Sequence, residues 1–244
     1  TCNIAATPDW SVTFDVSAVV DSNTVAITAD HTDPAGNNAN QATQIVVKDT
    51  GNPTLAISSA PTINNVNKAA YVVTGTCSDN GRQINVKVGP GASPSVNATC
   101  ITNVWSATLN TTLEVDGLAL SITANTTDAQ GNAATPATTT VIKDTVIPTV
   151  TITTSTSINN ANKNAYTVSG TCSEDGEAIN VSVGSAIPGA ADICGGAPDN
   201  ISGEWDVTFN VSGAADSPTI AILADHKDAA SSSAVQANAS VLKD

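Results

Sequence analysis

The amino-acid sequence predicts an all-β protein built from tandem β-sandwiches of about 97 residues per repeat. Three observations lead to this prediction. The chain of 244 residues repeats itself at a nearly constant interval, its apolar residues alternate with polar ones, and Thr, Val and Ile, which favour pleated strands, are abundant. No segment sustains apolar residues at helical spacing, so helices are not expected.

The repeat is clearest in the tryptophans. Trp10, Trp105 and Trp205 are the only three in the chain, and they lie 95 and 100 residues apart. The dipeptide Lys-Asp that begins at residues 48, 143 and 243 recurs at the same two intervals. An upstream element, NKAAYVVTGTCSDNG, ends at residue 81 and recurs only once, 95 residues later.

These offsets divide the chain into three units. Residues 1–50 form the C-terminal half of a repeat, and residues 51–145 and 146–244 form two complete repeats. A half unit cannot bury its own apolar face, so we expect the chain to be a piece of a longer array.

Alternation at a period of two places the strands of the last repeat. They are expected near residues 148–154, 165–172, 178–184, 204–211, 218–226 and 235–243, with a seventh if a short strand lies between 185 and 203. Six or seven short antiparallel strands in this length indicate an immunoglobulin-like sandwich. It differs from an antibody domain, because the Trp opens a later strand and the Cys pair joins the end of the second strand to the loop after the third.

Residues 1–50 hold only the later strands of a repeat, expected near residues 10–16, 24–31 and 43–48. Their inward-facing residues are Trp10, Val12, Phe14, Val25 and Ile27. Three strands cannot bury this row, and the open sheet edge invites another chain. We therefore expect completion by a preceding part of the same polypeptide or by a neighbouring subunit.

Five cysteines occupy equivalent repeat positions. Cys77 and Cys100 lie 23 residues apart, and Cys172 and Cys194 lie 22 apart, so each pair is expected to form a disulfide. Cys2 aligns with the second member of each pair and is expected to have no partner within the chain. Paired cysteines in small β-domains indicate an oxidising compartment. A metal–thiolate site is disfavoured, because the chain has no CxxC or Cys/His grouping.

The junctions between repeats resemble a known family. The segments VKDTGNPTLAI from residue 47 and IKDTVIPTVTI from residue 142 are similar to the joints of bacterial immunoglobulin-like repeats, and so is TADHTDPAGN ending at residue 37. The resemblance covers the whole chain and implies an extended rod in a bacterial surface adhesin or biofilm protein. The sequence departs from the family pattern in its two Cys per full repeat and in Ser231-Ser232, where Gly-Asn is expected.

Acidic residues gather at the same junctions. In an immunoglobulin-like sandwich the linker enters beside the second–third and sixth–seventh strand loops. The residues brought together at the two joints would be Asp49, Asp79 and Asp128 at one, and Asp144, Glu174, Asp175 and Asp228 at the other. Converging carboxylates would suit Ca²⁺, which takes 6–8 oxygen ligands, and the family resemblance also implies calcium between domains. The alternative is ordinary turn chemistry with solvated carboxylates.

Charge and motifs exclude several classes of function. The net charge of −14 opposes binding to nucleic acid or anionic membranes, and no apolar run is long enough to insert into a bilayer. No nucleophile elbow, metalloprotease, P-loop or dinucleotide motif occurs. His31 and His226 are equivalent, but Thr126 replaces them in the middle repeat, which argues against a catalytic His. We predict that the protein is not an enzyme.

The prediction is a structural repeat segment of an extracellular fibre or adhesin at a bacterial cell surface. It would act as a semi-rigid spacer, with neighbouring repeats or subunits as partners. Three alternatives stay open: a self-assembling filament subunit, a glycan- or protein-binding module, and an accessory spacer in a secreted enzyme. The sequence offers no exposed aromatic platform that would single out a binding module.

Overall fold

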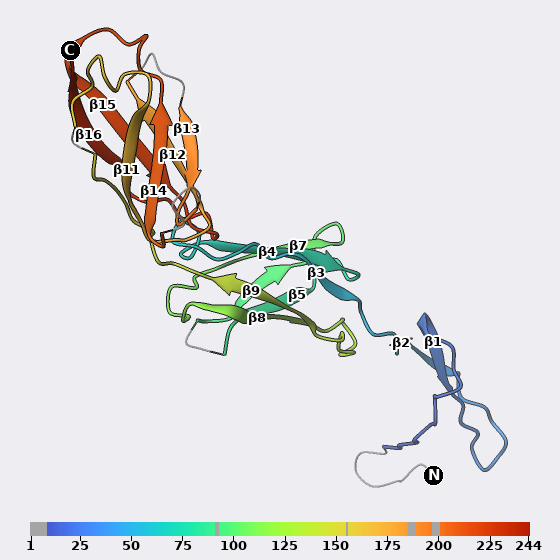
Figure 1. The fold of residues 1–244 in the computed structure, drawn as a ribbon. Coiled ribbons are helices and arrows are strands. Elements are labelled where there is room, and N and C mark those ends of the chain that lie inside the picture. The colour runs from blue at the N-terminus through green and yellow to red at the C-terminus, as the bar shows by residue number, and fades with distance from the viewer. Residues whose placement is uncertain (1–8, 91–92, 155, 185–188, 197–200) are drawn as a thin grey trace.

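The computed structural model describes residues 9–90, 93–154, 156–184, 189–196 and 201–244. In this part of the chain all regular elements are strands, paired antiparallel in five sheets. Figure 1 shows three successive units, with the half unit at one end and the last repeat at the other. The all-β prediction is confirmed.

The middle repeat is a sandwich of two sheets. One has the order β3-β4-β7 and the other β6-β5-β8-β9. Its strands are β3 (Leu55–Ser59), β4 (Tyr71–Cys77), β5 (Gln83–Val88), β6 (Val96–Thr99), β7 (Val104–Leu109), β8 (Gly117–Thr126) and β9 (Ala137–Lys143). Seven antiparallel strands split three and four in this order form an immunoglobulin-like sandwich.

The last repeat has the same topology. Its sheets have the orders β10-β11-β14 and β13-β12-β15-β16. Its strands are β10 (Val150–Ile152), β11 (Tyr166–Cys172), β12 (Ala178–Val183), β13 (Ala190–Ile193), β14 (Glu204–Phe209), β15 (Ser217–His226) and β16 (Ala237–Lys243). All six expected strands form, and β13 is the seventh.

The fourth strand of each repeat changes the description of the disulfide. Cys100 follows β6 and Cys194 follows β13, so the second cysteine lies after the fourth strand and not in the loop after the third. The short fourth strand was hard to see because its burial pattern is weak: Val96 and Ala98 turn inward, whereas β13 has no fully buried residue.

Each sandwich buries the residues that the alternation points inward. In β4 the buried residues are Tyr71, Val73, Gly75 and Cys77, which occupy alternate positions. The residues between them are exposed or half-buried. Trp105 on β7 packs over Gly75, where an added Cβ would lie 2.5 Å from the indole carbons. The indole Nε1 donates to the carbonyl oxygens of Ala56 and Thr76, both at 3.2 Å. A Gly at this position therefore lets the Trp close the core against backbone oxygens.

The N-terminal half unit has two described strands, β1 (Ser22–Ala29) and β2 (Ala42–Lys48), which form a hairpin. The expectation of a strand near residues 10–16 is wrong for the structure, in which these residues belong to no sheet. The reason is that the equivalent strands β7 and β14 pair with β4 and β11, and residues 9–50 contain no counterpart of those partners.

Candidate functional site: the joints between repeats

A Lys–Asp ion pair fixes the end of each unit. The pairs are Lys48–Asp21 at 2.6 Å, Lys143–Asp116 at 2.5 Å and Lys243–Asp216 at 2.7 Å. In each case the Asp precedes the sixth strand of the unit and the Lys ends the seventh, so the pair closes the base of the hairpin.

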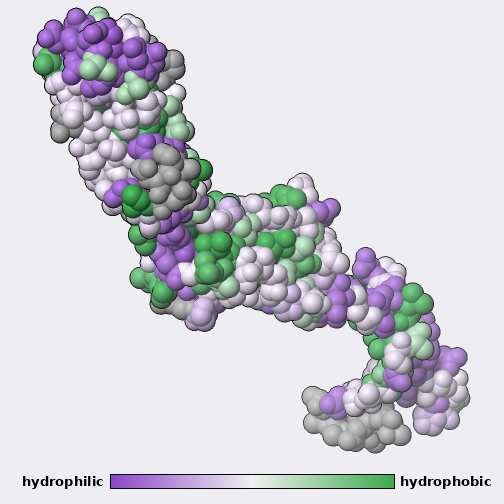
Figure 2. Space-filling view, in the orientation of Figure 1, coloured by the Kyte–Doolittle hydropathy of each residue, from purple (hydrophilic) through white to green (hydrophobic). Residues whose placement is uncertain are grey.

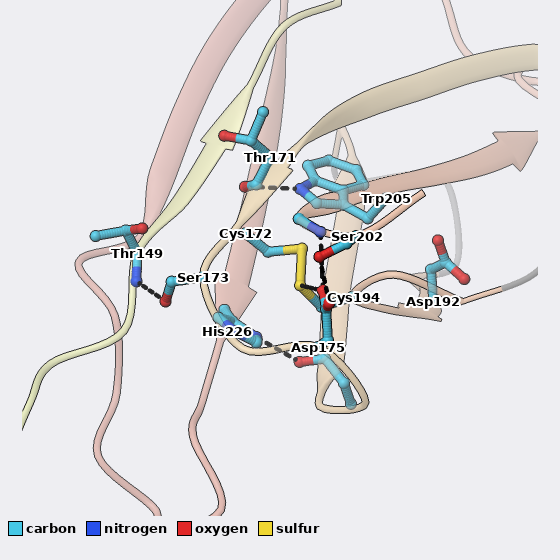
Figure 3. The surroundings of a disulfide bond; sticks show 12 residues. Thr149, Thr171, Cys172, Ser173, Asp175, Asp192, Cys194, Ser202, Trp205 and His226 are labelled. Atoms are coloured by element: carbon cyan, nitrogen blue, oxygen red, sulfur yellow. Dashed lines mark hydrogen bonds between the residues drawn. A yellow bond between two sulfur atoms is a disulfide. The ribbon is translucent and has the colours of Figure 1, made fainter. Parts of the chain in front are cut away.

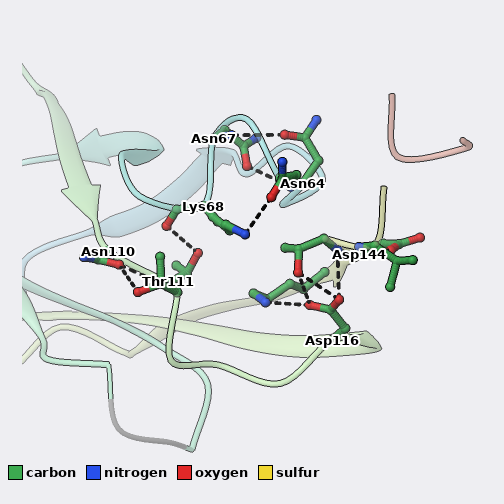
Figure 4. Close-up of polar contacts among 12 residues, drawn as sticks. Asn64, Asn67, Lys68, Asn110, Thr111, Asp116 and Asp144 are labelled. Carbon is green, nitrogen blue, oxygen red and sulfur yellow. Dashed lines mark hydrogen bonds and ion pairs between the residues drawn. The ribbon is translucent and has the colours of Figure 1, made fainter. Parts of the chain in front are cut away.

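The same Asp also holds the start of the linker. Asp116 accepts hydrogen bonds from the backbone amide of Thr145, at 2.9 Å, and from its hydroxyl, in addition to the Lys143 ammonium (Figure 4). Burial raises the pKa of Asp116, but the bonds from Lys143 and Thr145 outweigh it and hold the pKa below its usual value. Asp116 is therefore a charged anchor for the linker at neutral pH.

The first joint repeats this anchor. Asp21 accepts from Lys48 and from the amide and hydroxyl of Thr50, at 2.9 and 2.8 Å. The Lys48 hydrogen bond, followed by those of Thr50, lowers the pKa of Asp21 to about 2.

The far end of each linker is tied to the next repeat. The amide of Thr149 donates to Ser173 Oγ at 2.9 Å, and the amide of Thr54 donates to Ser78 Oγ at 3.0 Å. Between the two anchors lie only residues 146–148 in one linker and 51–53 in the other, and each ends in Pro. Because only three residues lie between the anchors and the φ of the proline is fixed, each linker has little rotational freedom.

Two hydrogen bonds join a repeat directly to what precedes it. Asn64 lies between β3 and β4 of the middle repeat, and its Nδ2 donates to the carbonyl oxygen of Ala230 at 2.8 Å. Ala230 belongs to the β15–β16 loop of the last repeat. At the other joint, Asn132 Nδ2 donates to the carbonyl oxygen of Asp49 at 3.0 Å. In both joints the loop between the sixth and seventh strands contacts the preceding segment.

The three acidic residues predicted at the first joint do not form one cluster. Asp128 is buried and uses both carboxylate oxygens, accepting from the amides of Gln130 and Asn132 and from Asn132 Nδ2 at 2.7 Å. Asp49 accepts from the amide of Gly51, and Asp79 from Ser78. These are short-range turn contacts of the kind that Asp forms without a metal.

The four acidic residues predicted at the second joint also separate. Asp175 accepts from the Ser202 hydroxyl and from the Gly203 amide at 2.8 Å, beside the Cys172–Cys194 disulfide (Figure 3). The Ser202 and Gly203 bonds lower the pKa of Asp175. Asp144 accepts from the amide of Val146 at 3.1 Å, and the Glu174 backbone carbonyl closes a turn.

Asp228 differs from its equivalent in the middle repeat. It is 5% exposed, its Oδ1 accepts from the Ser232 amide at 2.7 Å, and its Oδ2 has no hydrogen-bond partner in the described chain. Ser232 Oγ is likewise buried and without a partner. Asn132 supplies the missing donor in the middle repeat, so the Ser at 232 accounts for the difference. This is the position at which the sequence departs from the Gly-Asn of the family pattern.

Within the described ranges, no group of three or more His, Cys, Asp or Glu side chains is arranged to hold a metal ion. Calcium binding by the predicted set therefore stays a prediction. Of the two buried carboxylates in the set, Asp128 and Asp228, only Asp228 keeps an oxygen without a hydrogen-bond donor in the described chain.

Both full repeats are cross-linked at the end that faces the preceding unit. Cys77 is bonded to Cys100 and Cys172 to Cys194, as the spacing predicts. Cys2 lies outside the described residues. The second bond lies beside Trp205, whose Nε1 donates to the Thr171 carbonyl (Figure 3).

The Lys–Asp–Thr anchor was not among the sites predicted from the sequence. The signal was available, because Asp21, Asp116 and Asp216 recur at the 95- and 100-residue offsets of the Lys-Asp dipeptide. Each Asp and its Lys are separated by 27 positions in the sequence, and only the folded hairpin brings them into contact.

No family model and no curated protein matches the chain. Similar solved structures include a Ca²⁺-stabilised adhesin with which an Antarctic bacterium reaches out and binds ice, at 19% identity and a TM-score of 0.46, covering 94% of this chain and 58% of that one. A 1.5-MDa bacterial ice-binding adhesin aligns at 20% identity and a TM-score of 0.42, covering 93% and 76%.

Fibronectin(III)-like modules of CbhA from Clostridium thermocellum align at 13% identity and a TM-score of 0.45, covering 78% of this chain and 95% of that one. The chain thus spans 58% of the Antarctic adhesin structure. The neighbours include repeat domains of bacterial adhesins, and the fold assignment rests on the strand order described above. No helix in the described residues is long and apolar enough to cross a membrane.

Proposed function

We propose that the chain is a spacer segment of an extracellular bacterial adhesin or fibre, in which tandem immunoglobulin-like repeats form a semi-rigid rod. The observation that carries the proposal is the double anchoring of the linkers. With Thr145 tied to the middle repeat and Thr149 to the last, only three residues lie between the two anchors, one of them Pro148.

Stiffness follows from this arrangement because the repeats cannot tumble independently. A flexible linker of comparable function would be Gly/Ser-rich and free of anchors. The Asn64–Ala230 hydrogen bond adds a direct contact across the second joint. Figure 1 shows the repeats joined end to end, with a bend between the middle and last repeats. A rod of this type sets the reach of whatever lies at its tip.

The extracellular location is supported by chemistry that belongs to the repeats themselves. Two disulfides in equivalent positions persist in an oxidising compartment and not in a reducing cytosol. The assignment to a bacterial surface rests in addition on the resemblance of the linkers to bacterial immunoglobulin-like repeats.

The test compares two equivalent aspartates. Asp116→Ala removes the anchor at the second joint, whereas Asp216→Ala removes the equivalent Lys–Asp pair at the opposite end of the last repeat, away from that joint. Spin labels at the equivalent exposed positions Asn85 and Asn180, in a chain with Cys2→Ser, would report the distance distribution between repeats. We expect Asp116→Ala to broaden it and Asp216→Ala to leave it unchanged. An equally broad distribution in the unmodified chain would contradict the spacer proposal.

Calcium is the finer part of the proposal, and we propose that it binds at the second joint. Asp228 offers a buried carboxylate oxygen without a donor, and Ser232, whose amide donates to the other oxygen of Asp228, has a buried hydroxyl without a partner in the described chain. At the first joint both oxygens of Asp128 already accept hydrogen bonds, so a cation there would compete with the donors of Gln130 and Asn132. Titration calorimetry with Ca²⁺ on the chelated full chain should give one binding event that Asp228→Asn abolishes and Asp128→Asn retains. Absence of heat together with unchanged label distances would leave turn chemistry as the whole role of these carboxylates.

A further inference from the structure

The N-terminal half unit exposes an apolar face that both full repeats bury. Trp10 is 56% exposed, whereas its equivalent Trp105 is 2% exposed. Phe14 is 61% exposed against 1% for Leu109. Hydrophobic side chains are visible on the surface of this unit in Figure 2. An exposed row of this size on a soluble chain marks an interaction surface.

The hairpin of the half unit already has the geometry of a complete repeat. Val25 lies opposite Val46, as Leu120 lies opposite Val141 in the middle repeat. The irregularity at the start of β1 recurs at the same place in β8 and β15. The Lys48–Asp21 pair is also formed. The surface is therefore preorganised for the strands that cover it in the other repeats.

One edge of the hairpin is open. Among the described residues, β1 pairs only with β2, whereas its equivalents β8 and β15 each pair with a strand on both sides. The additional partner in those repeats is β5 or β12, which places Val88 opposite Ile122 and Val183 opposite Ile222. In β1 the corresponding residue is Ile27, which is 38% exposed. The unpaired backbone edge of β1 can therefore accept one more antiparallel strand.

A groove of about 650 Å³ runs along this face. Its apolar lining comes from the hairpin and from the segment that precedes it. The residues are Phe14, Val16, Val19, Val25, Ile27 and Val46. Asp15 and Lys48 stand among the lining residues. The groove therefore takes alternating apolar side chains from an extended segment, and a charged ligand would leave the apolar lining without a match.

We propose that this groove binds the front-half strands of a repeat of the same type, in the place that β4 and β5 occupy in the middle repeat. Two features define the partner. Its first strand has the pattern Tyr-x-Val-x-Gly-x-Cys, with the Gly facing Trp10, and its second has Ile-x-Val-x-Val facing β1. Both full repeats contain this pair, as YVVTGTC with INVKV and as YTVSGTC with INVSV.

The glycine makes the partner specific. At Gly75 and Gly170 an added Cβ would meet both the neighbouring strand's backbone oxygen and the indole of the repeat's own Trp. The same indole in the half unit, Trp10, requires the same space. A second copy of this chain does not supply it, because its two front halves are engaged in their own sandwiches. The proposal does not depend on the spacer function.

The experiment adds the front half as a separate peptide. The probe is a peptide of residues 51–99 with Cys77→Ser, and its control carries Gly75→Val in addition, which keeps the strand propensity but fills the space of the indole. Amide hydrogen exchange of the full chain is measured with each. We expect the probe to slow exchange in residues 9–30 at least tenfold and the control to leave it unchanged. Equal protection by both peptides would overturn the specificity.

A fusion guards against a peptide that does not fold. Residues 51–98 are joined to Thr1 of the full chain, which restores the order of a complete repeat. We expect a monomer in which residues 9–30 are protected as strongly as residues 104–126. Unchanged rapid exchange in the fusion would refute the proposal. So would a dimer of the unmodified chain that Ile27→Asp converts to monomer, because a second copy would then be the occupant.

Discussion

Substitution of Gly170 by Ala tests whether the Trp–Gly contact closes the last sandwich. Gly170 lies on β11, between the carbonyl oxygen of Thr151 on β10 and the ring of Trp205 on β14. An added Cβ would overlap that oxygen and lie 2.5 Å from Trp205 Cζ2. Neither neighbour can yield freely, because one is backbone and the other is buried at 3% exposure. Either β10 or the indole must move.

The expected loss follows from these contacts. Overpacking a core costs about 1–3 kcal/mol. Displacement of the indole also breaks the hydrogen bond from Trp205 Nε1 to the Thr171 carbonyl, worth about 1 kcal/mol. Ala restricts the unfolded chain and returns about 0.4–1 kcal/mol. The last repeat should therefore lose about 2 kcal/mol of unfolding free energy, a fall in Tm of roughly 8–16 °C for a domain of this size.

Scanning calorimetry of the full chain measures this loss, since the middle repeat should keep its own transition. Gly213→Ala is the matched control in the same repeat, because no atom lies within 4 Å of the added Cβ and its φ is not positive. It should leave Tm unchanged or raise it slightly. If Gly170→Ala unfolds within about 0.5 kcal/mol of this control, the steric reasoning is refuted.

Two further predictions concern the disulfide and the linker anchor. Replacing both Cys172 and Cys194 by Ala should destabilise the last repeat by about 3 kcal/mol in denaturant unfolding, because the bond closes a loop with a sequence separation of 22; a loss below about 1 kcal/mol would show that the unfolded chain is not constrained as assumed. Because the pKa of Asp21 is lowered to about 2, its contacts are fully present above about pH 4 and lost as the pH falls through 2. The NMR shift of the Thr50 amide, which donates to Asp21, should therefore titrate with a midpoint near pH 2 and become independent of pH in Asp21→Asn; a midpoint near 4 would contradict the anchor.

The strands of the full repeats could be predicted from the sequence because burial in a sandwich imposes a period of two on every strand. Trp205, Val207 and Phe209 are buried as the alternation requires. The prediction failed at residues 10–16, which have the same alternation but belong to no sheet. A strand forms only with a hydrogen-bonding partner, and the alternation of Trp10 and its neighbours does not report whether that partner is present.

The acidic residues at the joints show a second limit. Sequence placed Asp128 and Asp228 in equivalent loops, but whether a carboxylate faces a cation or its own turn depends on donors within hydrogen-bond distance. Asn132 satisfies Asp128, and Ser232 is too short to do the same for Asp228. A single side-chain difference thus decided which carboxylate keeps a free oxygen.

The sequence by itself determined the repeat length, the all-β class, the inward rows of the full repeats and the pairing of the cysteines, because each depends on local alternation or on comparison between copies. Only the tertiary structure decided how the linkers are held. Asp116 and Thr145 are 29 residues apart in the chain and meet because β8 and β9 fold back on each other. The tertiary structure also shows that no strand among the described residues covers the face around Trp10. Covering it requires strands on the opposite side of the sandwich, and a local pattern carries no information about them.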